Sequence, residues 1–192
     1  MANLPTREEA LALMHEHVAS ESLRRHMYSV EAACRAYARK FGEDEELFGL
    51  AGLIHDFDYE RWPEEHPLPG IDMLRERGWP EEVIHAVQAH YAARTGVEPT
   101  TTIDRTLCAC DEVTGLITAA ALVRPSRSVM DLEAKSVLKK FKDKAFAAGV
   151  DRDEVRHAVE RLGVDLSEHV QFVIEAMRGI APELGLGGTA EA

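Results

Sequence analysis

The sequence predicts an all-α protein built as a helical bundle. Helix-capping patterns recur along the whole chain, and no segment has the alternation of apolar and polar residues that is typical of a strand. The segment 103–122 is apolar on most sides, which favours a central, buried helix. We therefore expect helices packed on one another around a core that includes this segment.

The first half of the chain has the clearest helix boundaries. Thr6 and Glu9 form a capping-box pattern, and the helix that they open is expected to reach about residue 18. Gly42 and Gly78 follow apolar-periodic segments and are expected to end the helices before them. Pro80 suits the first turn of the next helix. One predicted helix begins after Asp44 and ends near the pair His55–Asp56. The others predicted here cover 6–18, 22–40, 67–77, 80–93 and 103–122.

The second half predicts a basic helix over 133–148 and two further helices, with Asp151 and Ser167 as caps. Residues 185–192 are rich in Gly and Ala and are expected to form a flexible tail. The predicted organisation is a single domain with a helical core over 1–122, C-terminal helices over 123–184 packed on it, and the tail.

The composition is that of a soluble globular domain. Apolar residues make up 45% and charged ones 29%, and 22 basic against 34 acidic side chains give a net charge of −12 over 192 residues. That charge repels nucleic acids and anionic lipid surfaces at long range. No apolar run approaches the ~20 residues that span a bilayer, and the first residues do not resemble a signal peptide. We expect a cytoplasmic protein whose partner is neither a nucleic-acid polymer nor a membrane.

The adjacent pair His55 and Asp56 ends a predicted apolar helix and is the first candidate for chemistry. Neighbouring residues on a helix point ~100° apart, so the pair chelates one metal only if the backbone turns there. Alternatively, the pair contacts two neighbouring metals, because a carboxylate has two oxygens and bridges readily. Imidazole supplies a neutral nitrogen donor to the same ions.

His26, the pair His55–Asp56 and Asp111 occur in the order of the H…HD…D signature, and the sequence resembles the HD-domain superfamily of metal-dependent phosphohydrolases. The segment LAGLIHDFDYE looks like that family's apolar helix running into HD, and LCACDEVTGLI looks like its late aspartate helix. The resemblance covers about residues 23–122. It implies an HD-domain-like bundle in which these four residues converge on one metal from three helices.

Two more histidines resemble those of the family's dinuclear members. His66 opens HPLPG, which is similar to an HP-x-x-G segment whose histidine binds a second metal, and His90 follows 24 residues later. His85 is a rival for His90, but five positions turn it roughly 140° away on a helix. The resemblance implies two divalent ions (Mn, Fe, Co or Mg) with Asp56 bridging them. The implied ligands are His26, His55, Asp56, His66, His90 and Asp111.

Basic side chains are candidates for holding a substrate phosphate. Arg25 is next to the first signature histidine, and Arg94 lies four residues after His90, on the same helical face if that helix continues. The forked guanidinium of arginine matches phosphate oxygens. Three lysines on one face of the basic helix form either an anion-binding wall or a solvated face: Lys135, Lys139 and Lys142.

The leading interpretation is a metal-dependent phosphohydrolase that cleaves a small phosphomonoester or phosphodiester, nucleotide-derived ones included. The resemblance implies that a water shared by two ions attacks phosphorus, while Asp58 acts as the general acid or only as a cap. The segment HYAARTGVEP lacks the GYP of cyclic-di-GMP phosphodiesterases, which argues against that substrate. Two alternatives stay open: an HD-fold di-iron oxygenase acting on a small polyol or phosphonate, and a non-catalytic protein stabilised by its metals.

Overall fold

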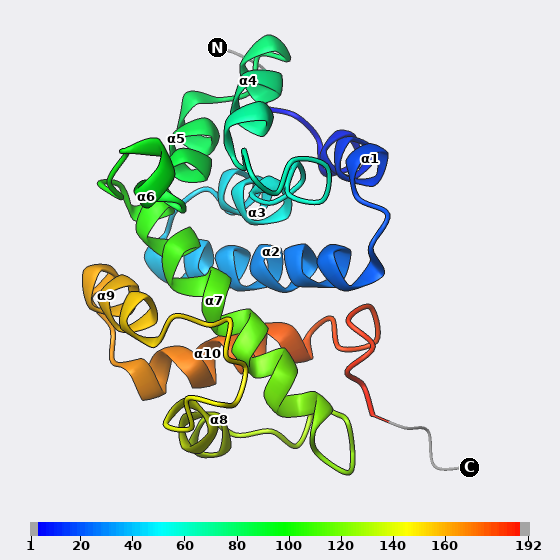
Figure 1. The fold of residues 1–192 in the computed structure, drawn as a ribbon, viewed down its shortest axis with the longest axis vertical. Coiled ribbons are helices and arrows are strands. Elements are labelled where there is room, and N and C mark those ends of the chain that lie inside the picture. The colour runs from blue at the N-terminus through cyan, green and yellow to red at the C-terminus, as the bar shows by residue number, and fades with distance from the viewer. Residues whose placement is uncertain (1–3, 189–192) are drawn as a thin grey trace. The chain divides into compact units, whose positions relative to one another are not determined.

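The computed structural model describes residues 4–188 and confirms the all-α prediction (Figure 1). In this part of the chain β-pairing is limited to one isolated bridge, between Ser128 and Gly187. None of its helices has the length and hydropathy that crossing a membrane requires. The helices are α1 (Arg7–His17), α2 (Glu21–Phe41), α3 (Glu45–Ile54), α4 (Leu68–Glu76), α5 (Glu81–Ala89), α6 (Ala92–Thr95), α7 (Thr102–Leu122), α8 (Ala134–Phe141), α9 (Arg152–Leu162) and α10 (Leu166–Arg178).

The chain forms two compact units, and the division between them falls inside α7, after Cys108. Groups on each side of this point have hydrogen-bond partners in different units. The Cys108 thiol donates to the Ala89 carbonyl at 3.6 Å, whereas the Ala109 carbonyl accepts a bond from His169 Nε2 at 2.7 Å. From the sequence, the boundary between the helical core and the C-terminal helices was predicted at residue 122, where α7 ends. That the two parts form one domain stays a prediction.

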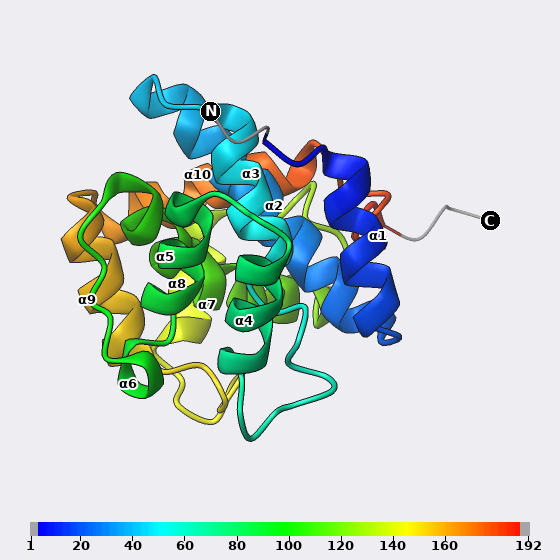
Figure 2. The same cartoon turned by 90° about the horizontal axis from the view of Figure 1, so that it is seen from above.

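In the first unit α3 is the central helix and packs against α1, α2 and α5 (Figure 2). All of its residues from Phe48 to Ile54 are buried, so this helix is apolar on every side. Asp44 caps its start by accepting bonds from the backbone N–H groups of Glu46 and Leu47. The cap fixes the beginning of α3, and the packing of its apolar surface fixes where its last turn lies.

Two glycines let α3 approach α2 closely. A Cβ at Gly52 would lie 2.8 Å from the backbone N and Cα of Glu31, and a Cβ at Gly49 would lie 2.5 Å from the Arg35 guanidinium. Since no side chain fits at Gly52, the helix backbones approach each other directly there. This approach brings the end of α3, which carries His55, to the side of α2.

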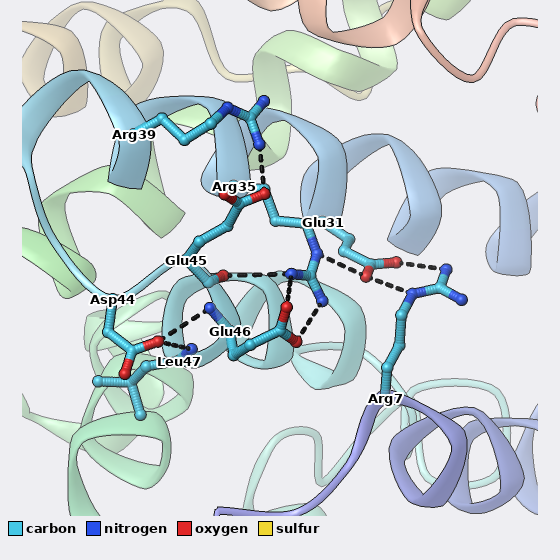
Figure 3. Close-up of polar contacts among 8 residues, drawn as sticks. All are labelled: Arg7, Glu31, Arg35, Arg39, Asp44, Glu45, Glu46 and Leu47. Carbon is cyan, nitrogen blue, oxygen red and sulfur yellow. Dashed lines mark hydrogen bonds and ion pairs between the residues drawn. The ribbon is translucent and has the colours of Figure 1, made fainter.

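A charged network also joins α1, α2 and α3 (Figure 3). The Glu31 side chain is only 5% exposed, and Arg7 donates to both of its oxygens at 2.6 and 2.9 Å. Arg35 donates to the same carboxylate at 2.9 Å and also to Glu46 at 2.8 and 3.0 Å. Because a buried carboxylate needs such partners, this network fixes the positions of the three helices relative to one another.

In the second unit α10 packs against α8 and α9. The basic helix predicted over 133–148 is shorter than expected and ends at Phe141. The physical reason is Arg152, whose guanidinium donates to the carbonyls of Asp143, Phe146, Ala147 and Val150 and so holds the following segment in turns.

The predicted flexible tail is wrong for its first residues. Leu186 is buried, and its carbonyl accepts bonds from the Val129 N–H at 2.9 Å and the Ser128 hydroxyl at 3.1 Å. These contacts order the segment because an apolar side chain and a backbone pair are satisfied together. The rest of that prediction, over 189–192, lies outside the described residues.

Candidate metal centre

The centre is built at the point where α3 ends. His55 is the C-cap of α3, and its Nδ1 lies 2.8 Å from the Gly52 carbonyl one turn earlier. A carbonyl only accepts, so Nδ1 carries the proton and Nε2 carries the lone pair. The backbone leaves the helix directly afterwards, and this change of direction allows the neighbouring Asp56 to face the same space.

Each oxygen of the Asp56 carboxylate lies near a different pair of imidazoles. Oδ2 is 3.4 Å from His55 Nε2 and 3.8 Å from His26 Nε2. Oδ1 is 3.2 Å from His66 Nε2 and 3.5 Å from His90 Nε2. In each pair the imidazole nitrogens and an Asp56 oxygen lie within 4.8 Å of one another, as the donors of one metal ion do. The arrangement suits a carboxylate that bridges two ions.

The hydrogen bonds on the far side of the rings support a cation at this place. His90 Nδ1 donates to the Val87 carbonyl at 2.5 Å, so its Nε2 has the lone pair. His66 Nδ1 lies 2.6 Å from the Asp58 carboxylate, so its Nε2 is the nitrogen that can bind a metal. This Nε2 lies 3.2 Å from the Nε2 of His90. Two nitrogen lone pairs and a carboxylate oxygen repel one another at such distances unless a positive charge lies between them. The residues therefore fit divalent metal ions.

Asp58 orients His66. Its side chain is buried, with Oδ1 bound to His66 and Oδ2 accepting the Gly70 backbone N–H at 2.9 Å. The Gly70 bond also satisfies an N–H in the first turn of α4, the helix that follows Asp58 in the chain. A carboxylate with both oxygens occupied and only 1% of the residue exposed does not reach a substrate. The geometry therefore opposes a role of Asp58 as general acid. It supports a role in which Asp58 fixes the tautomer of His66.

The charges of the centre act strongly on one another. Burial by itself raises the pKa of Asp56, but the surrounding imidazoles of His55, His66 and His90 outweigh burial and hold that pKa well below its usual range. Burial by itself lowers the pKa of His66, whereas Asp56 and Asp58 raise it, to about 9. A proton on His66 and a metal ion on the same nitrogen thus satisfy the same need for positive charge.

Of the other predicted site residues, Asp111 lies on α7 and belongs to the second unit, and its role as a ligand stays a prediction. The rival histidine, His85, pairs instead with the buried carboxylate of Asp104 at 2.9 Å. Arg25 is half-exposed on α2 and pairs with Glu21.

Arg94 does not share a helical face with His90. Tyr91, with φ −124° and ψ 57°, separates α5 from α6, so the predicted helix over 80–93 ends at Ala89. Arg94 instead donates to the Glu64 carbonyl and lies over the Tyr91 ring. Three lysines are exposed on α8 or at its C-cap in the second unit, and their contact with a substrate stays a prediction: Lys135, Lys139 and Lys142.

Two residues beside the centre were not among the sequence-predicted site residues. The rings of Tyr59 and Tyr91 have centroids 5.4 and 5.9 Å from that of His66. Each tyrosine is close in sequence to a predicted ligand, since Tyr59 follows His55 by four residues and Tyr91 follows His90 directly. That proximity is the signal that was present in the sequence.

Comparison with known proteins agrees with this geometry. Residues 23–116 match the family described as HD domain. A ribonuclease Y of Desulfotalea psychrophila is 29% identical over 142 residues, which cover 69% of this chain and 26% of that protein. A tRNA (cytidine(56)-2'-O)-methyltransferase of Thermoplasma volcanium is 30% identical over 91 residues, which cover 47% of this chain and 27% of that protein.

The chain thus spans about a quarter of the length of these curated relatives. No solved structure shows a significant match to it. The matched residues include His26, the pair His55–Asp56 and Asp111, in the order that the signature requires. Residues 23–116, just under half of the chain, therefore match the HD-domain family, whose members are generally metal-dependent phosphohydrolases.

Proposed function

We propose that this protein is a metal-dependent phosphohydrolase that cleaves a small phosphomonoester or phosphodiester, nucleotide-derived esters included. The observation that carries the proposal is the Asp56 carboxylate, with one oxygen facing His26 and His55 and the other facing His66 and His90. A shared carboxylate with two imidazole pairs suits two ions that act on the same phosphate.

The proposed ligands divide into two sets that share Asp56. His26, His55 and Asp111 complete the first, and His66 and His90 complete the second. Bound divalent ions, whether Mn, Fe, Co or Mg, would neutralise phosphate charge and lower the pKa of a water molecule. Asp111 is assigned from the family signature.

The reaction is a hydrolysis and needs no oxidant or reductant. The water oxygen forms a bond to phosphorus, the ester P–O bond breaks, and the leaving oxygen takes a proton to give an alcohol and a phosphate. One side chain and two backbone carbonyls of the protein orient the ligands. Asp58 holds His66, and the carbonyls of Gly52 and Val87 hold His55 and His90.

The substrate is proposed to be a small molecule. The two relatives are named for RNA enzymes, but the net charge of −12 opposes the approach of a long polyanion. Phosphate contacts are proposed for five basic residues: Arg25, Arg94, Lys135, Lys139 and Lys142.

The test is a screen of metal-loaded protein against phosphomonoesters, phosphodiesters and a short RNA, with each candidate metal in turn. Turnover of a small ester is expected, and Asp56→Asn should lower it by at least about two orders of magnitude. Asp72→Asn, an exposed aspartate on α4, is the matched control and should keep full activity. Metal-dependent O₂ consumption with a polyol or phosphonate would instead identify the oxygenase. Protein that binds metal stoichiometrically but turns over none of these substrates would indicate that the metals have a structural role.

A further inference from the structure

The exposed aromatic side chains of the described residues are Tyr59, 48% exposed, and Tyr91, 38% exposed. Both contact the ring of His66, although they come from different segments of the chain. Their exposure leaves apolar surface in water beside the ligand cluster. A pair of exposed rings at one place on a surface indicates a binding site more strongly than scattered apolar residues do.

The geometry of the two rings differs. The Tyr59 ring stands nearly perpendicular to that of His66, at 82°, whereas the Tyr91 ring is tilted by 34° to it. Tyr91 also approaches His90, with centroids 6.5 Å apart. Both rings therefore lie close to the place where a phosphate held at the imidazoles of His66 and His90 would carry its organic group.

The segment that carries Tyr59 is held firmly. Asp58, the residue before it, is buried and bonded to His66 and Gly70. Glu60, the residue after it, accepts bonds from the backbone N–H groups of Ala19, at 3.1 Å, and Ser20, at 2.9 Å. With both neighbours fixed, Tyr59 faces solvent from an ordered backbone. Binding of a ligand to Tyr59 therefore costs little conformational entropy.

Tyr91 is held as well. Its backbone carbonyl accepts bonds from the N–H groups of Arg94 and Thr95, at 3.0 and 3.1 Å. The Arg94 guanidinium lies 5.5 Å from the centre of the Tyr91 ring and donates to the Glu64 carbonyl. Arg94 thus brings a positive charge to the aromatic pair, which favours an anionic ligand in a protein of net charge −12.

From this arrangement we propose that Tyr59 and Tyr91 determine specificity, by holding a planar aromatic ring of the substrate, a nucleobase, next to the metal centre. The proposal rests on the proposed phosphohydrolase function and narrows its substrates to nucleotides. Aromatic side chains hold nucleobases because every base has a π-face for contact, whereas a sugar phosphate or glycerol phosphate has none.

The test compares adenosine 5′-monophosphate and adenosine 3′-monophosphate with ribose 5-phosphate, which lacks the base. Binding to Mn²⁺-loaded protein is measured by calorimetry, and kcat and KM are measured for the same esters. At least one nucleotide should bind about 5- to 150-fold more tightly than ribose 5-phosphate. Tyr59→Leu and Tyr91→Leu should remove most of this difference without weakening ribose 5-phosphate, whereas Tyr59→Phe and Tyr91→Phe should keep it.

Tyr28→Leu is the matched control, because Tyr28 is a partly buried tyrosine two residues from His26 on α2, about 200° around the helix. It should leave the preference unchanged. Equal binding of nucleotides and ribose 5-phosphate by the wild-type protein would overturn the proposal even if a variant failed to fold. Equal loss for both ligands in the Leu variants would overturn it too. If no ester is hydrolysed, the phosphohydrolase function fails, and calorimetry still decides whether the tyrosines hold a base.

Discussion

Asp58 Oδ1 lies 2.6 Å from His66 Nδ1, on the opposite side of the imidazole from the Asp56 carboxylate. The Asp58→Asn substitution removes the negative charge and leaves one amide oxygen, which can accept from His66 or from Gly70 but not from both. We expect the affinity for the ion that His66 is proposed to bind to fall by about 10- to 100-fold, while the protein still folds. Metal titration followed by calorimetry measures this, with Asp72→Asn as the exposed control. An unchanged affinity would contradict the orienting role of Asp58.

The pKa of His66, raised to about 9, predicts a pH dependence. In protein stripped of metal by chelation, the ion pairs of protonated His66 stabilise the fold fully below pH ~6.5, and this contribution is lost as the pH rises through about 9. Metal must displace the same proton, so metal affinity should rise between these pH values, by up to about tenfold per unit. Thermal denaturation from pH 6 to 10, with and without Mn²⁺, tests both trends. His66→Gln should flatten both, and a metal affinity independent of pH would contradict the assignment.

Gly52 is predicted to tolerate no side chain. In Gly52→Ala the new Cβ would lie 2.8 Å from the Glu31 backbone, which cannot move aside as a flexible side chain would. We expect α2 and α3 to separate, at a cost of about 1–3 kcal/mol in the free energy of unfolding. Gly115→Ala is the control, because nothing lies within 4 Å of its Cβ and alanine favours a helix by about 0.5–1 kcal/mol. Urea denaturation measures both variants, and equal effects would contradict the close approach.

The network of Figure 3 predicts unequal effects for two arginines on α2. Arg35→Met leaves the buried Glu31 with Arg7 alone and should cost about 2–3 kcal/mol. Arg39→Met removes an ion pair to Glu45 in which both side chains are exposed, and should cost less than about 1 kcal/mol. Chemical denaturation at pH 7 compares them, and a larger loss for Arg39→Met would contradict the network.

Arg35 should also shape the acid stability. Its bond to Glu46 lowers the pKa of that carboxyl, so the pair contributes stability above pH ~4.5 that is lost as the pH falls through the lowered pKa. The Arg35→Met variant should therefore lose less stability than the wild type between pH 5 and pH 3. Denaturation midpoints across this range measure the difference.

Features set by neighbouring residues were predictable from the sequence. The capping box of Thr6 and Glu9 and the left-handed Gly42 are present as expected. The signature order also led to His26, His55 and Asp56, whose side chains meet because two predicted helices carry them. Short-range signals suffice there, since a cap and its helix lie within one turn of chain.

Features set by contacts between residues more than a helix turn apart were not predictable. Nothing near Asp58 in the sequence indicates that Gly70 and His66 occupy its oxygens. The end of α5 at Ala89 was not predicted for a similar reason, because the Thr95 hydroxyl donates a hydrogen bond to the Gln88 carbonyl. Each of these outcomes depends on a partner that the folded chain supplies.

The bridge between Ser128 and Gly187 determines how far the protein can be shortened from its C-terminus. Truncation at Gly185 would remove the acceptor of the Val129 N–H and leave a hole in place of the Leu186 side chain. Truncation after Gly188 keeps both. An affinity tag or a fused partner is therefore best joined beyond residue 188, where its attachment leaves this closure undisturbed.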